Sequence, residues 1–91
     1  MKFPLCYDAT ITRAEFIRTL PAAVGEDGFR EVDGRFEGSG WSIRLTPIDA
    51  FRIGMVHMER HRVEIEFDGM TADEQERFMQ RFSLHYQRGG G

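Results

Sequence analysis

Two histidines four residues apart have the residue type and spacing that a metal site requires. His57 and His61 lie on either side of Glu59. On a helix this spacing would turn both imidazoles to one side, where they could hold a metal ion, with His85 or Cys6 as a third ligand. The zinc-protease motif differs, because its Glu directly follows the first His. The local sequence favours a strand end and a turn, so we expect a solvated hairpin tip, with a metal or small-ligand site as the alternative.

Other reactive side chains lack the neighbours that catalysis needs. Cys6 is the single cysteine, and nothing near it indicates a helix N-terminus or a shaped pocket, so we expect a half-buried, inert thiol. Glu64, Glu66 and Asp68 alternate with apolar residues, which is typical of the solvated face of a strand. Paired carboxylates do acid–base work only in a cleft that separates their pKa values. We therefore predict no catalytic residue, no cofactor and no enzymatic activity.

The basic residues could instead bind an anionic polymer. The formal net charge is −3, which disfavours nucleic acid as a partner. Arg44 and Arg52 lie in the one locally basic stretch, and they alternate out of phase with the aromatic residues that would have to stack on bases. An anionic-polymer binder acting through these two arginines is the second alternative.

The tail from Arg88 to Gly91 ends in glycines. A C-terminal diglycine resembles that of ubiquitin-like modifiers and sulfur-carrier proteins. In those families the glycines enter an activating enzyme and the terminal carboxylate is adenylated, so the resemblance implies the same for this tail. Those proteins have a central helix within a β-grasp sheet, whereas this sequence has its strands between two helices. The other interpretation is a helix C-cap at Gly89 followed by a frayed end.

Three period-two apolar stripes predict the sheet that would position these groups. They predict strands at about 41–45, 51–58 and 62–68, joined by loops at 46–50 and 59–61. In this register all the stripes share one face, and Arg52 lies opposite Asp68 and beside Arg44. A two-residue turn at Arg60-His61 would instead place Val56 and Met58 beside the third stripe. The stripes are Trp41, Ile43, Leu45; Phe51, Ile53, Met55; and Val63, Ile65, Phe67.

Amphipathic segments with capping boxes close each end of this region. Thr12 with Glu15, and Thr71 with Glu74, have the spacing in which side chain and backbone cap one another. Pro21 predicts a kink in the first helix or its end near Thr19. A short strand at about 35–37 would turn at 38–40 into the next strand, although Asp33-Gly34 is itself a hairpin signal. Near the N-terminus, Pro4 weakens a short edge strand.

Together these elements predict one α+β domain over residues 1–91, with 89–91 as a flexible tail. The expected fold is a two-layer α-β-β-β-α sandwich. Its antiparallel meander has three strands, or four with the short strand before Trp41, and both terminal helices cover one face. The predicted core comprises Phe16, Ile17, Leu20, Trp41, Ile43, Leu45, Ile53, Met55, Ile65, Phe67, Phe78, Met79 and Phe82.

The uncovered sheet face then provides the expected binding site. We predict a non-enzymatic interaction module whose partner is another protein or a second copy, in a homodimer. No run approaches the length of a membrane span, and the N-terminus lacks the pattern of a signal peptide. We therefore expect a cytoplasmic protein. The predicted binding residues are Arg44, Arg52, Val56, Met58 and Arg62.

Overall fold

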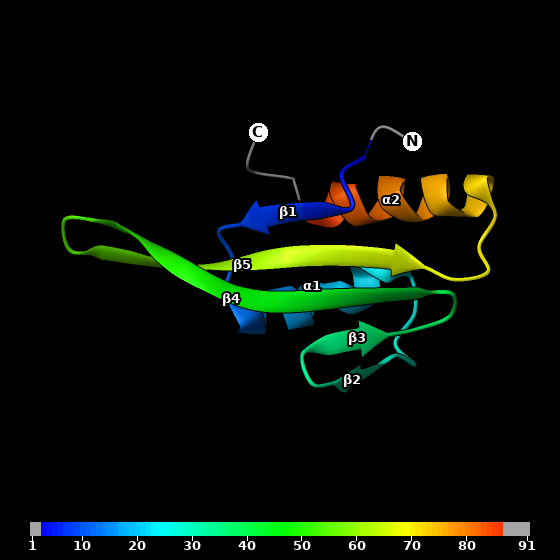
Figure 1. Ribbon diagram of the computed structural model, residues 1–91, viewed down its shortest axis with the longest axis horizontal. Helices are drawn as coiled ribbons and strands as arrows, with labels where there is room; N and C mark the ends of the chain where they lie inside the picture. The colour runs from blue at the N-terminus through cyan, green and yellow to red at the C-terminus, as the bar shows by residue number, and fades with distance from the viewer. Residues whose placement is uncertain (1–2, 87–91) are drawn as a thin grey trace.

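The computed structural model describes residues 3–86, which form five strands and two helices (Figure 1). All neighbouring strands are antiparallel, and their order across the sheet is β1-β5-β4-β3-β2. The α+β prediction is confirmed. The elements are β1 (Cys6–Ala9), α1 (Arg13–Val24), β2 (Arg30–Val32), β3 (Arg35–Glu37), β4 (Trp41–Ile53), β5 (Val56–Phe67) and α2 (Ala72–Tyr86).

The predicted count of three or four strands is wrong, because both sheet edges carry a short additional strand. β1 begins two residues after Pro4 and pairs with β5. β2 pairs with β3 through a tight turn at Asp33-Gly34. Both turn residues have positive φ, 52° and 80°, which is what a two-residue hairpin turn of the primed type requires. The Asp-Gly pair therefore outweighs the weak strand propensity of the residues before it.

The predicted middle strand does not exist as a separate element. Residues 46–50 continue β4 instead of forming a loop, and the chain turns at Gly54-Met55 instead of at 59–61. Gly54 has φ 57°, which suits the first position of a two-residue hairpin turn with glycine. β4 and β5 are consequently one long hairpin, in which Leu45 lies opposite Val63 and Ile43 opposite Ile65. The predicted register, in which a middle strand at 51–58 separates the first stripe from the third, is therefore wrong.

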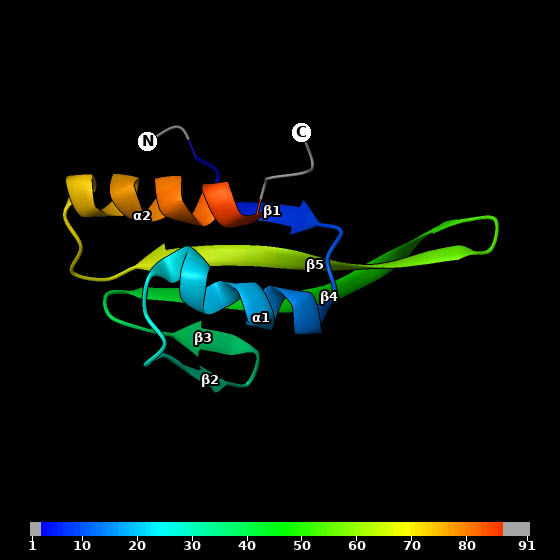
Figure 2. The same ribbon diagram turned by 180° about the vertical axis from the view of Figure 1, so that it is seen from behind.

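Both helices lie on the same side of the sheet, behind it in Figure 1 and in front of it in Figure 2. The buried side chains of α1 and α2 meet those of β3, β4 and β5 in one core. Ile53 and Met55 are exposed, so their assignment to the core is wrong; Ile17 and Phe67 are only partly buried. The core comprises Phe16, Leu20, Ala23, Phe36, Trp41, Ile43, Leu45, Val63, Ile65, Phe78, Met79 and Phe82.

The helix termini follow the capping boxes. Thr12 Oγ1 accepts a hydrogen bond from Glu15 N at 3.0 Å, and Thr71 and Glu74 exchange side-chain-to-backbone bonds. Of the two alternatives predicted at Pro21, an end of α1 near Thr19 is wrong, because the helix continues through Pro21 to Val24. It ends when Gly25, with φ 77°, donates its N–H to Pro21 O, a left-handed cap that glycine adopts without steric cost.

Among residues 3–86, neither helix has the length and apolar character needed to span a membrane. The predicted flexible tail, residues 89–91, lies outside the described residues.

Candidate functional site

Part of the β4–β5 hairpin extends beyond the rest of the sheet, as Figures 1 and 2 both show. β3 pairs with β4 only at residues 42–44, and β1 pairs with β5 only at residues 61–64. Within the described part of the chain, residues 46–60 therefore have strand partners only in β4 and β5. We call this two-stranded segment the arm.

One face of the arm is apolar. Phe51 lies opposite Met58, and Ile53 lies opposite Val56; directly opposed residues share one face of an antiparallel pair. Their relative exposures are 46%, 44%, 63% and 57% in that order. Met55, at the turn, is fully exposed. Four large apolar side chains therefore lie together in solvent, which is unusual for a chain this small.

A β-bulge in β4 produces this grouping. The register changes between the pairs Ile48–Arg60 and Phe51–Met58, so β4 has one more residue than β5 in this interval. An inserted residue reverses the phase of alternation. Odd-numbered residues of β4 face the core before the bulge, whereas Phe51 and Ile53 face the opposite side after it. That side is continuous with the uncovered face of the sheet.

The structure does not bring together the arginines of the predicted site. Arg44 lies opposite Glu64 in the body of the sheet, Arg52 lies opposite His57 on the arm, and Arg62 lies opposite Thr46. The predicted position of Arg52, opposite Asp68 and beside Arg44, is therefore wrong. Val56 and Met58 are exposed side chains of the arm, where they join Phe51 and Ile53. Sequence reasoning missed the last two because the bulge has no clear signal in the sequence.

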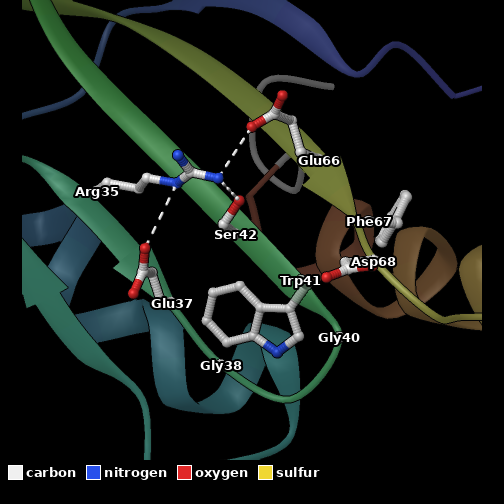
Figure 3. A pocket seen from close by; sticks show the side chains of 9 residues that line it. All are labelled: Arg35, Glu37, Gly38, Gly40, Trp41, Ser42, Glu66, Phe67 and Asp68. Atoms are coloured by element: carbon white, nitrogen blue, oxygen red, sulfur yellow. Dashed lines mark hydrogen bonds and ion pairs between the residues drawn. The ribbon is translucent and has the colours of Figure 1, made fainter.

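The uncovered face of the sheet body is polar, and Arg35 is paired there with acidic side chains. Arg35 donates to Ser42 Oγ at 2.9 Å and to Glu66 Oε1 at 3.1 Å, and it lies 3.7 Å from Glu37. Figure 3 shows this guanidinium spanning three strands at the edge of a shallow pocket. Because two carboxylates already neutralise Arg35, and Asp68 adds a further acid to the lining, the pocket does not favour an anionic ligand.

A second charged group links β1 to β5. Arg62 donates from Nε to Asp8 Oδ1 at 2.8 Å, and Arg60 lies 3.9 Å from the same carboxylate. The hydrogen bond from Arg62 is the main cause that lowers the pKa of Asp8, and the positive charge of Arg60 adds to the effect. Arg62 thus stabilises the pairing of an edge strand, and its guanidinium is already engaged.

The two histidines of the candidate metal site are held apart. Both lie within β5, where four residues span roughly 13 Å, so they do not form the predicted hairpin tip. His61 is buried and its Nδ1 lies 2.8 Å from Ile11 O, whereas His57 is exposed. Among residues 3–86 no group of three His, Cys, Asp or Glu side chains is placed to hold a metal ion. Cys6 is exposed rather than half-buried.

A family model described as archaeal MoaD-like protein matches residues 9–91. The chain belongs to this archaeal MoaD-like family. No curated protein and no solved structure matches it. The family match includes the glycine tail noted in the sequence, although Arg88–Gly91 lies outside the described residues. Among residues 3–86 of this MoaD-like chain, four of the five strands, β2 to β5, lie between the two helices in sequence order, so the departure from a sheet with one central helix remains.

Proposed function

We propose that this MoaD-like protein is a non-enzymatic interaction module that binds another protein through its arm. The observation that carries the proposal is the exposure of Phe51, Ile53, Val56 and Met58 on one face of a two-stranded ribbon. Burying such side chains contributes about 25 cal/mol per Å² of apolar surface removed from water. A partner that covers this face would gain that free energy.

The construction of the arm supports the same proposal. An isolated two-stranded hairpin has marginal stability in water, and a third strand or a packed layer is needed to stabilise it. The helices cover the sheet body (Figure 2), and the apolar face of the arm is on the side away from them. A partner on this face would supply the missing layer.

Several observations favour binding over catalysis. His57 and His61 are separated along a strand, and Arg35 and Arg62 are held by carboxylates. We place the module in the cytoplasm, since a chain with the single Cys6 forms no internal disulfide.

Site-specific photocrosslinking in cells tests the arm as the binding surface. A photoreactive residue at position 51 should form a covalent adduct with one other protein species. The matched control is position 84, since Leu84 is also a large exposed apolar residue but lies on α2. Equal, diffuse labelling from both positions would contradict the proposal. Substitution of Ile53 by Ser should remove the specific adduct without changing the circular dichroism spectrum.

A carrier role at the glycine tail is a second candidate function, and the extent of the family match favours it. The tail follows α2, whose last residue is firmly attached: Tyr86 donates its hydroxyl to Phe16 O at 2.6 Å and stacks on the Phe16 ring. In this candidate the carboxylate of Gly91 attacks the α-phosphate of ATP on an activating enzyme, and pyrophosphate leaves. The arm then serves to dock that enzyme.

Intact-mass spectrometry of protein from its native lysate tests the carrier role. The expected species carries sulfur in place of a terminal oxygen, or is joined through Gly91 to another molecule. Gly90→Ala widens the tail and should abolish the modification, whereas Leu84→Ser should leave it unchanged. An unmodified terminus in the unsubstituted protein would contradict the carrier role and leave the interaction role of the arm standing.

A further inference from the structure

We propose that the arm pairs with the arm of a second copy, edge to edge along β5, about a two-fold axis at Met58. This inference rests on the proposed interaction function, because it assigns a second copy to the free edge of the same arm and leaves the apolar face open to a further partner. Three features of the β5 edge support it: the length of the unpaired segment, the direction of its backbone N–H and C=O groups, and the order of its charged side chains.

The free edge of β5 has two fixed limits. It begins at Val56, after the turn at Gly54-Met55, and it ends at Arg60, because Ala9 of β1 already pairs with His61. Two copies of this segment in antiparallel orientation overlap completely in only one register. In that register Met58 lies opposite Met58 of the second copy, and Val56 lies opposite Arg60. The position of the axis therefore follows from the length of the edge.

The backbone N–H and C=O groups along this edge point outward at the positions that such pairing needs. Ile65 N donates to Leu5 O in the segment that leads into β1, so odd-numbered residues of β5 direct their backbone groups toward this side. By alternation His57 and Glu59 do the same along the arm. Opposed across the axis, these two residues form a pair that exchanges both backbone hydrogen bonds. Edge groups of this kind are a template for another strand.

The side chains of the edge are self-complementary. His57 of each copy lies beside Glu59 of the other, so an imidazole meets a carboxylate twice. Met58 meets its own copy, and Val56 packs on the aliphatic stem of Arg60. Cross-strand pairs of these kinds each contribute roughly 0.2–1 kcal/mol. No like charges are opposed in this register.

The other edge of the arm is less suited to pairing. On β4, Pro47 has no N–H to donate, and the bulge between Ile48 and Phe51 interrupts the ladder. Proline and bulges are the features by which proteins block strand edges. The β5 edge instead borders a groove lined by Thr10, Ile11, Thr12, Glu15, His57, Met58 and Glu59.

The pairing also supplies what the arm lacks. Two arms joined along β5 form a four-stranded sheet, which exceeds the two-stranded ribbon that is marginal alone. The four-stranded sheet has the apolar faces of both arms on one side, so the contacts of Met58 and Val56 cross the axis. The interface is isologous, as expected for a two-fold dimer.

Disulfide trapping tests the axis directly. Opposed residues in a non-hydrogen-bonded pair have Cα atoms about 4.5 Å apart, which is within the range that a disulfide spans. In a Cys6→Ser background, Met58→Cys should form a covalent dimer under mild oxidation. The matched control is Val56→Cys, whose symmetry mate lies roughly 13 Å along the strand and should stay monomeric. Equal crosslinking of both variants would overturn the register.

Reciprocal charge changes test the identity of the partner. Glu59→Lys places Lys beside His57 of the second copy, and His57→Glu places two carboxylates together. Each variant alone should therefore sediment as a monomer. An equimolar mixture should recover the dimer, because both pairs then have opposite charge. Asp27→Lys, which makes the same charge change in a loop after α1, should leave the dimer intact.

Two results separate this inference from the function on which it rests. A monomer in sedimentation at high micromolar concentration, together with a specific heterologous adduct at position 51, would overturn self-pairing and support the interaction role. A monomer with no specific adduct would overturn both.

Discussion

The indole Nε1 of Trp41 donates a hydrogen bond to Glu26 Oε1 at 2.6 Å. Glu26 also accepts from the backbone N–H of Ser39 at 3.1 Å. One carboxylate thus joins the loop after α1 to the turn between β3 and β4. Hydrogen bonds to charged groups contribute about 1.5–3 kcal/mol, so this contact fixes the ring of Trp41 where the core begins.

The fixed ring makes position 38 intolerant of a side chain. A Cβ at Gly38 would lie 2.3 Å from Trp41 ring atoms, so Gly38→Ala should lower the free energy of unfolding by about 1–3 kcal/mol. Gly28→Ala is the matched control, because nothing lies within 4 Å of its Cβ, and it should change stability by less than about 1 kcal/mol. Urea denaturation of both variants measures the difference. Equal losses would contradict the packing described.

Phe82 lies at the centre of the helix layer. It is 1% exposed and contacts the rings of Phe78 and Tyr86. Phe82→Ala should cost about 3–5 kcal/mol, since it removes a large buried side chain and leaves a cavity. Leu84→Ala, on the exposed side of the same helix, should cost far less. Chemical denaturation that shows a loss below about 1 kcal/mol for Phe82→Ala would refute this core position.

Burial of Tyr7 predicts a loss of stability in alkali. Desolvation raises the pKa of Tyr7 from 10.0 to about 12. The unfolded chain therefore loses this proton at lower pH than the folded chain, so the free energy of unfolding should fall as pH rises from about 10 to about 12. Absorbance titration at alkaline pH in a Tyr86→Phe variant follows Tyr7 alone. Ionisation near pH 10 with the near-ultraviolet circular dichroism retained would contradict the burial.

The contact of Asp8 with Arg62 predicts the opposite dependence in acid. Because Arg62 lowers the pKa of Asp8 below 3.8 in the folded chain, its stabilising contribution is present above that value and is lost as pH falls through the folded pKa. Carboxyl chemical shifts measured by NMR should show the lowered pKa, and Arg62→Gln should raise it. Arg30→Gln, at the opposite edge of the sheet, should have no effect.

Much of the fold could be predicted because local signals and burial agreed. The stripe from Trp41 to Leu45 and the capping boxes at Thr12 and Thr71 predicted elements that the structure confirms. α1 is longer than the alternative that ended it near Thr19. The free energy gained by burying Leu20 and Ala23 outweighs the hydrogen bond lost at Pro21.

The arm could not be predicted, because its apolar residues have the pattern of a core strand. Phe51 and Ile53 alternate with other residues in the same way as the buried residues of a core strand. Period-two spacing does not distinguish a strand face that helices cover from one that lies beyond the helices and is exposed. Pro47 further favoured a loop. The bulge then placed these residues with Val56 and Met58, which had been assigned to the opposite face.

The separation of arm and body gives the chain two units that can change independently. Beyond Thr46 and His61 the hairpin no longer shares strand partners with β1 or β3, so residues can be added to or removed from its tip in matched pairs while every core side chain keeps its neighbours. The reach of the arm can therefore vary among relatives without altering the stability of the body.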